Sequence, residues 1–404
     1  MRKLCISLLL VALCLNQAQA QAASQPAAKQ PHDMEKMWQA MLARPAMAVA
    51  ATFDEQGRLW RGRVRDGYLL VSYSDDVGAS YSTPVRVNPE PEALAADGEN
   101  TPKLIAKGGV LYVSYTRSLE KPMTGDIRFS RSLDGGESFS VPITVNDNRE
   151  VISHRFDAMA VNGKGQIYIA WLDKRDQSAA RKAGGEYLGA ALYYAVSEDG
   201  GKSFRNNVKI ADHACECCRT AMALDSDGVP VVVWRHIFDT NIRDHAVVKL
   251  DAQAMPVRMS HENWNVAACP HHGPSVSITR EGVYHAAWFS NAPQRQGLFY
   301  ANSIDKGKTF SAPLSFGNSA MQASHPAVLG LGKKVYLVWK EFDGEHTTIL
   351  LKHSIDGGQA WSAPASLAST SDASENPSLI SGRGHVFLSW NTKNEGHRMI
   401  EVGE

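Results

Sequence analysis

Short runs of apolar residues recur along the chain, with glycine-containing turns between them. The runs at 110–115, 167–171, 231–234, 335–339 and 385–390 have the length of strands, and several are rich in β-branched residues. A period of 3.6 residues appears only at 34–42, which predicts one short helix. The pattern therefore predicts an all-β protein.

A Ser-x-Asp-x-Gly-x-x-aromatic motif repeats within this pattern. Its aspartates are Asp76, Asp134, Asp199, Asp305 and Asp356. The longest interval is 106 residues, and a degenerate copy near Asp251 divides it into two intervals of similar length. A repeat of roughly 50 residues indicates one structural unit used several times.

Two further columns of residues keep the same period. The first opens an apolar run and consists of Pro45, Pro102, Phe156, Thr220, Pro274, Pro326 and Pro377. The second is an aromatic residue 13 to 15 positions later: Trp60, Tyr115, Trp171, Trp234, Trp288, Trp339 and Trp390. Seven members in each column predict a β-propeller with seven four-stranded blades, and six blades are the alternative.

These motifs resemble the Asp-box (BNR repeat) propellers of the sialidase superfamily, over about residues 44–404. The resemblance implies that each box is a hairpin between the third and fourth strands of a blade. Its serine and aspartate would bond turn amides, so the five aspartates are expected to be structural rather than catalytic. A seventh box would fall beyond Glu404. The last blade is therefore expected to lack its outer strand or to take it from the N-terminal segment.

The first residues read as a secretory leader. Residues 1–20 combine Arg2 and Lys3, an apolar core at 4–15 and a small-residue cleavage pattern ending at Ala20. Residues 21–43 are predicted to be a flexible N-terminal segment that carries the short helix, and 44–404 the propeller. We therefore expect a periplasmic or secreted protein with no membrane span after leader removal.

Charge excludes some classes of partner. The 404 residues carry 42 Lys+Arg and 42 Asp+Glu, and removal of the leader leaves 40 basic residues. Binding to nucleic acid requires a basic field, which this balance does not supply. The expected partners are a metal ion or small ligand at the channel mouth, with a glycan or a protein as further candidates.

The cysteines fall in two consecutive repeats. Two of the six, Cys5 and Cys14, lie in the leader. The others directly precede apolar runs that are predicted to be innermost strands: Cys215, Cys217, Cys218 and Cys269. Histidines occupy matching positions of the repeats: His154, His271, His272 and His325. Because loops of all blades converge at one end of a propeller channel, this register predicts a Cys/His cluster at the channel mouth.

Three interpretations of this cluster remain open. Thiolates with imidazoles suit copper, with zinc as the alternative. In an oxidising compartment the four cysteines could instead form two structural disulfides. A closely spaced pair could also carry out thiol–disulfide exchange. The neighbouring histidines favour a metal, because a disulfide requires none.

The resemblance also implies a test for sialidase activity. Sialidases hold the substrate carboxylate with three arginines and use a tyrosine nucleophile paired with a glutamate. Arg44, Arg155 and Arg219 are the candidates for such an anion site. Glu186 and Tyr187 are adjacent and are the candidates for this pair, in an insertion at 173–189 predicted to be a loop or lid. Catalytic residues are unassigned. A sialidase-type glycoside hydrolase and a non-catalytic glycan- or protein-binding propeller with structural disulfides are therefore the alternatives to a metal-binding protein.

Overall fold

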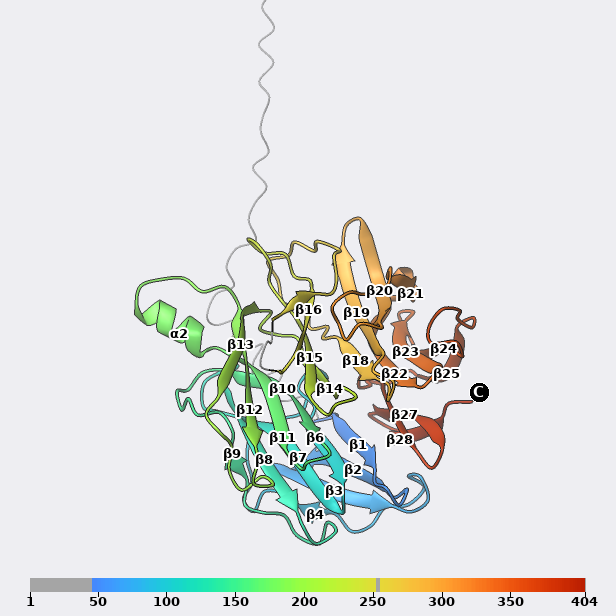
Figure 1. Cartoon of the computed structure of the whole chain (residues 1–404). Coiled ribbons are helices and arrows are strands. Elements are labelled where there is room, and N and C mark those ends of the chain that lie inside the picture. The colour runs from blue at the N-terminus through green and yellow to red at the C-terminus, as the bar shows by residue number, and fades with distance from the viewer. Residues whose placement is uncertain (1–45, 252–254, 404) are drawn as a thin grey trace, which may run out of the picture. The chain divides into compact units, whose positions relative to one another are not determined.

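The computed structural model describes residues 46–251 and 255–403. These belong to the compact unit Pro45–Glu404. The predicted leader, the segment 21–43 with its helix, and Arg44 lie outside the described residues. The unit consists of seven antiparallel sheets that follow one another in sequence (Figure 1).

Blades one to three are meanders in which each strand pairs with the next. The first contains β1 (Val49–Phe53), β2 (Leu59–Arg65), β3 (Tyr68–Ser74) and β4 (Val85–Arg86). The second contains β6 (Lys103–Lys107), β7 (Val110–Ser118), β8 (Gly125–Ser132) and β9 (Ile143–Thr144), and the short β5 (Leu94–Ala95) also pairs with β7. The third contains β10 (His154–Val161), β11 (Ile167–Asp173), β12 (Ala190–Ser197) and β13 (Val208–Ala214).

Blades four to seven repeat the plan. The fourth contains β14 (Ala221–Leu224), β15 (Pro230–Arg235), β16 (His245–Lys249) and β17 (Val257–Arg258). The fifth contains β18 (Ser275–Ile278), β19 (Tyr284–Ala292), β20 (Arg295–Ser303) and β21 (Leu314–Phe316). The sixth contains β22 (Ser324–Leu331), β23 (Lys334–Phe342), β24 (Thr347–Ser354) and β25 (Ala365–Thr370). The seventh contains β26 (Ser378–Gly382), β27 (His385–Thr392) and β28 (Gly396–Glu401).

The seven blades close into a ring. The first strands β1, β6, β10, β14, β18, β22 and β26 each contact the next, and β26 contacts β1. The seven-bladed prediction is confirmed, and the six-bladed alternative is wrong. Among the described residues the seventh sheet has three strands.

The aromatic column packs the blades together. All seven of its members lie on second strands and are at most 4% exposed. Trp60 of blade one shares a buried cluster with Leu104 and Leu111 of blade two. Trp288 of blade five likewise clusters with Val231 and Val233 of blade four. Each aromatic side chain thus fills the seam between neighbouring sheets, where burying its large apolar surface contributes most to stability.

The repeated motif forms the expected hairpin at the end of the third strand. In blade two, the Ser132 hydroxyl donates to Oδ1 of Asp134 at 2.7 Å and accepts from the Gly136 N–H at 2.8 Å. The Asp134 carboxylate also accepts the Ser138 N–H at 3.0 Å. The other four complete boxes have equivalent bonds around Asp76, Asp199, Asp305 and Asp356. These carboxylates are therefore occupied in holding turns.

The insertion at 173–189 is not wholly a loop. Its first part forms the helix α2 (Arg175–Lys182), and a single 3-10 turn, η1 (Ser319–Met321), lies elsewhere in the described chain. Helix α2 has no buried residue, so it lacks the apolar stripe by which a helix is recognised in sequence. Nowhere in 46–251 or 255–403 does a helix have the length and apolarity needed to cross a membrane.

Replacing Gly136 by alanine is expected to destabilise the protein far more than replacing its neighbour Gly135. Both have positive φ, +87° and +71°, so either alanine would be strained. A Cβ at Gly136 would also lie 2.6 Å from Trp60, whereas one at Gly135 would meet nothing within 4 Å. We expect losses of about 1 kcal/mol for Gly135→Ala and about 3 kcal/mol for Gly136→Ala in urea unfolding. Equal losses would contradict this packing.

Candidate functional site

The cysteines lie in two loops that lead into innermost strands. Cys215, Cys217 and Cys218 follow β13 and precede β14, and Cys269 lies between β17 and β18. Since β14 and β18 line the channel in adjacent blades, the two loops meet at the channel mouth. The repeat register had predicted this placement.

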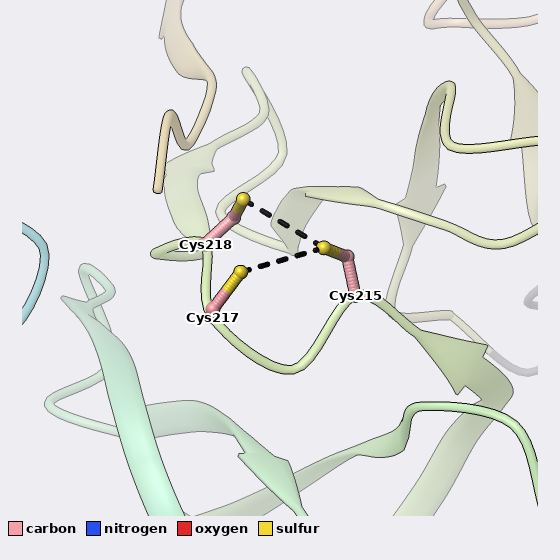
Figure 2. A group of neighbouring side chains, drawn as sticks. All are labelled: Cys215, Cys217 and Cys218. Carbon is pink, nitrogen blue, oxygen red and sulfur yellow. Dashed lines mark hydrogen bonds between the residues drawn. The ribbon is translucent and has the colours of Figure 1, made fainter. Parts of the chain in front are cut away.

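Three of the thiols form a buried group (Figure 2). The Sγ of Cys215 lies 3.8 Å from the Sγ of Cys217 and 3.8 Å from that of Cys218. Each of the three residues is 1% exposed. The turn is fixed to the neighbouring strand, because the Cys215 N–H donates to the Arg235 carbonyl at 2.9 Å.

A second group contains Cys217, Cys269 and His271, whose ligand atoms lie within 4.8 Å of one another. Cys269 and His271 are exposed, in contrast to the first group. All four described cysteines are free thiols. The separation of 3.8 Å is far longer than the roughly 2.05 Å of a disulfide. It does match two sulfurs bound to one tetrahedral metal at about 2.3 Å each, which lie about 3.8 Å apart.

Two arginines place positive charge beside the buried thiols. The Arg243 guanidinium donates from Nη1 to the Sγ of Cys215 at 3.1 Å. Arg235 is 1% exposed, and its guanidinium donates to the carbonyls of Arg243, His272 and Phe289. The pKa of Cys215 is lowered by the hydrogen bonds from the Cys217 and Cys218 thiols and by these two cations. The group can therefore supply a thiolate.

Glu99 joins the two cysteine loops and was not predicted from the sequence. Its Oε2 accepts the Arg219 N–H at 2.9 Å and the Gly273 N–H at 2.8 Å, and its Oε1 accepts Nη1 of Arg219 at 2.6 Å. Arg219 directly follows Cys218, and Gly273 directly follows His272. Glu99 lies three positions before Pro102, the register that Cys217 and His271 occupy in their repeats, and this correspondence could have identified it.

His272 and His325 lie next to this network rather than with the thiols. The His272 ring stacks on Phe289 at 4.2 Å and on His325 at 4.3 Å between centroids. Burial lowers the pKa of His272 to about 4. His325 donates from Nε2 to the His271 carbonyl at 3.2 Å. Neither imidazole belongs to the two described groups of ligand atoms.

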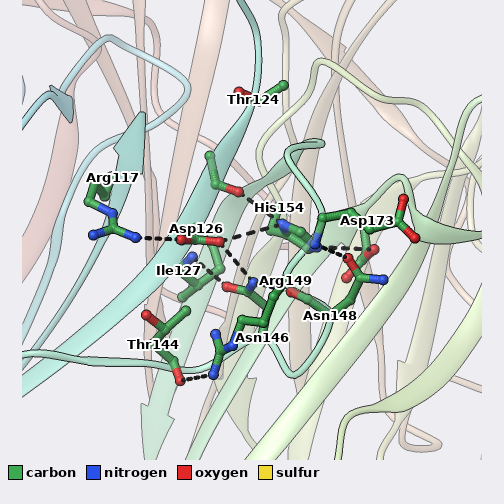
Figure 3. A network of polar contacts seen from close by, with 12 residues as sticks. Arg117, Thr124, Asp126, Ile127, Thr144, Asn146, Asn148, Arg149, His154 and Asp173 are labelled. Atoms are coloured by element: carbon green, nitrogen blue, oxygen red, sulfur yellow. Dashed lines mark hydrogen bonds and ion pairs between the residues drawn. The ribbon is translucent and has the colours of Figure 1, made fainter. Parts of the chain in front are cut away.

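His154 belongs to a separate polar network between blades two and three (Figure 3). Its ring is fully buried, and Nδ1 donates to the Gly125 carbonyl at 2.9 Å. Asp126 and Asp173 lie on either side, at 3.9 Å from Nδ1 and 3.8 Å from Nε2. Arg117 donates to Asp126 at 2.7 Å. These contacts give His154 a role at the seam of two blades.

Two of the three arginines predicted for an anion site, Arg155 and Arg219, lie among the described residues, and each has an acidic neighbour. Arg219 is paired with Glu99, while Nη2 of Arg155 lies 3.7 Å from Asp97. The Tyr187 hydroxyl donates to Asp212 at 2.7 Å, so Tyr187 has a partner other than Glu186.

A second acidic side chain, Glu375, is half-buried and interacts electrostatically with Glu99. Burial raises its pKa to about 7, as do Asp97 and Glu99, while Lys340 acts in the opposite direction. Burial also lowers the pKa of Lys340. A carboxyl group that titrates near neutrality beside an amine is a frequent arrangement for proton transfer.

Solved structures share this fold at low sequence identity. A protein of unknown function from Dyadobacter fermentans is 17% identical, with a TM-score of 0.51 over 78% of this chain and 96% of its own. An ulvan lyase is 11% identical, with a TM-score of 0.53 over 90% of this chain and 92% of its own. A leech intramolecular trans-sialidase is 9% identical, with a TM-score of 0.50 over 85% and 82% of the two chains. No protein-family model matches the chain. These similarities show that the chain shares the β-propeller fold of these proteins.

Replacing Glu99 by glutamine is expected to loosen both cysteine loops. The glutamine offers one acceptor oxygen where the carboxylate offers two, which leaves a buried donor unpaired. We expect a loss of about 1–3 kcal/mol in urea unfolding. We also expect faster native-state labelling of the buried thiols by a disulfide reagent. Glu92→Gln is the matched control, because Glu92 bonds Tyr115 and Arg128 within its own blade. Equal labelling of both variants would refute this role for Glu99.

The raised pKa of Glu375 predicts a pH dependence of stability. Between its ordinary value of 4.5 and about 7, the unfolded chain releases the proton while the folded protein retains it. The free energy of unfolding therefore falls as pH rises through this range. Glu375→Gln should remove about 1–2 kcal/mol of this fall between pH 4.5 and 8 in urea unfolding. Glu345→Gln at an exposed turn is the control. Parallel curves for wild type and Glu375→Gln would contradict the shift.

Proposed function

We propose that this propeller is an exported protein that holds a soft metal ion, copper as Cu(I), at the mouth of its channel. The observation that carries the proposal is the gathering of four free thiols and His271 from two adjacent blades. Thiolate ligands favour Cu(I) over the harder divalent ions, and zinc is the alternative. Bound there, the ion would supply a thiolate-coordinated, redox-active centre.

The chain's own residues support such a site in three ways. The loop turn that follows Cys215 presents Cys217 and Cys218 toward the same Sγ. Arg243 offsets the negative charge of a buried thiolate by donating to it. Glu99 fixes the two loops relative to each other. Metal binding therefore requires a smaller loss of conformational entropy of the loops.

Anaerobic purification from the exported fraction, followed by metal analysis and a free-thiol count, tests the proposal. We expect a stoichiometric amount of bound metal in the wild type. We expect this metal to be lost in the double variant Cys217→Ser with Cys218→Ser, because both groups of ligand atoms then lack at least one sulfur. The far-UV circular dichroism of this variant should match that of the wild type. Absence of both metal and free thiols would show that structural disulfides form instead. A preference for zinc in competition would correct the identity of the metal.

A glycan-active propeller is the second candidate, favoured by the half-buried Glu375 and its electrostatic interaction with Lys340. Two of the proteins that share the fold are named as an ulvan lyase and a trans-sialidase. In this alternative Glu375 is the proton donor or acceptor, and a glycan occupies the channel mouth. Turnover of a panel of sialosides and uronate-containing polysaccharides, abolished in Glu375→Gln, would support it. Inactivity toward the whole panel would leave the metal site as the function.

A further inference from the structure

The ligand atoms of the proposed site divide into two groups that share one sulfur. The first is made by Cys215, Cys217 and Cys218, and the second by Cys217, Cys269 and His271. Within each group all atoms lie within 4.8 Å of one another, and no set of four atoms in the described chain meets that limit. Two ligands of one metal at about 2.3 Å lie no more than about 4.6 Å apart. A single ion therefore cannot take all five ligands in this geometry.

We infer that the site holds two Cu(I) ions bridged by the thiolate of Cys217. This inference rests on the proposed metal-binding function and specifies its nuclearity. One ion is bound by the three sulfurs of the buried group, and the other by Cys217, Cys269 and His271. A thiolate sulfur retains more than one lone pair after deprotonation, so Cys217 can donate to both ions.

Charge balance agrees with two monovalent ions. Four thiolates carry four negative charges, and the Arg235 and Arg243 guanidinium groups beside Cys215 offset two of them. Two Cu(I) ions offset the remaining two, with His271 neutral. One Cu(I) ion and the two guanidinium groups balance the three thiolates of the buried group, and the second ion balances the thiolate of Cys269.

The two positions differ in access. Cys215 and Cys218 are each 1% exposed, whereas Cys269 and His271 are exposed. The outer ion can therefore exchange with a chelator in solution, while the inner ion requires opening of the loop. Since Cys217 belongs to both positions, its loss removes a ligand from each ion.

The test is an anaerobic titration of the full chain with Cu(I) against a colorimetric Cu(I) chelator. The wild type is expected to bind two equivalents. Cys269→Ser and His271→Gln are expected to retain only the inner equivalent, and Cys218→Ser only the outer one. Cys217→Ser is expected to bind neither at a chelator concentration where the wild type keeps both. His346→Gln, at an exposed turn, is the control and binds two.

The outcomes distinguish failure of the two-ion site from failure of the proposed metal-binding function. One equivalent in the wild type, lost in every ligand variant, overturns the two-ion site and leaves metal binding intact. No copper bound by the reduced wild type overturns both. X-ray absorption of the loaded wild type gives a check that needs no variant, because a copper–copper scattering path is expected and its absence overturns the bridge. Thermal unfolding of each apo variant identifies any that fail to fold.

Discussion

The channel mouth depends on one buried carboxylate. Glu99 comes from blade two, yet it accepts backbone N–H groups from the loops of blades four and five and pairs with a guanidinium. An isolated buried charge would be expensive, and these charge-assisted bonds offset that cost only while both loops stay in place. Because Arg219 and Gly273 directly follow the cysteine- and histidine-bearing segments, their position is fixed by a residue more than a hundred positions away.

The propeller frame explains why such loops meet at all. Each blade begins at the channel with its first strand and ends at the rim with its last. The segment that leads from the last strand of one blade to the first strand of the next must therefore return to the centre, and all such segments lie on one face of the ring. The buried aromatic residues, such as Trp171 and Trp234, fix neighbouring sheets at constant spacing. Most of the residues in these interblade clusters belong to the strands rather than to the returning segments. The returning segments can therefore carry charged, sulfur and imidazole side chains at the channel mouth, and three of their cysteines pack on Ile237.

The difference between the strands, which pack the ring, and the returning segments, which carry the site, also determines what could be predicted from the sequence. The repeat period predicted the seven blades and the placement of four cysteines in two neighbouring loops, because register fixes backbone position. It did not predict side-chain direction, and His272 turns to stack on Phe289 rather than toward the thiols. Glu99 was not predicted because two of its partners are backbone amides 120 and 174 residues away, and only its register three positions before Pro102 could have indicated it. Helix α2 was not predicted because it has no buried face.

The reduced thiols and the proposed export are linked physically. In an oxidising compartment, free thiols 3.8 Å apart would tend to form a disulfide, since only a modest movement closes the gap. A ligand that binds only the folded, reduced pocket stabilises it by RT ln(1 + L/Kd), which rises with the free ligand concentration L relative to Kd. Metal occupancy would therefore protect Cys215, Cys217 and Cys218 from oxidation. The hydrogen bonds from the Cys215 N–H to the Arg235 carbonyl and from Arg243 to the Cys215 Sγ act in the same direction, because they oppose movement of Cys215.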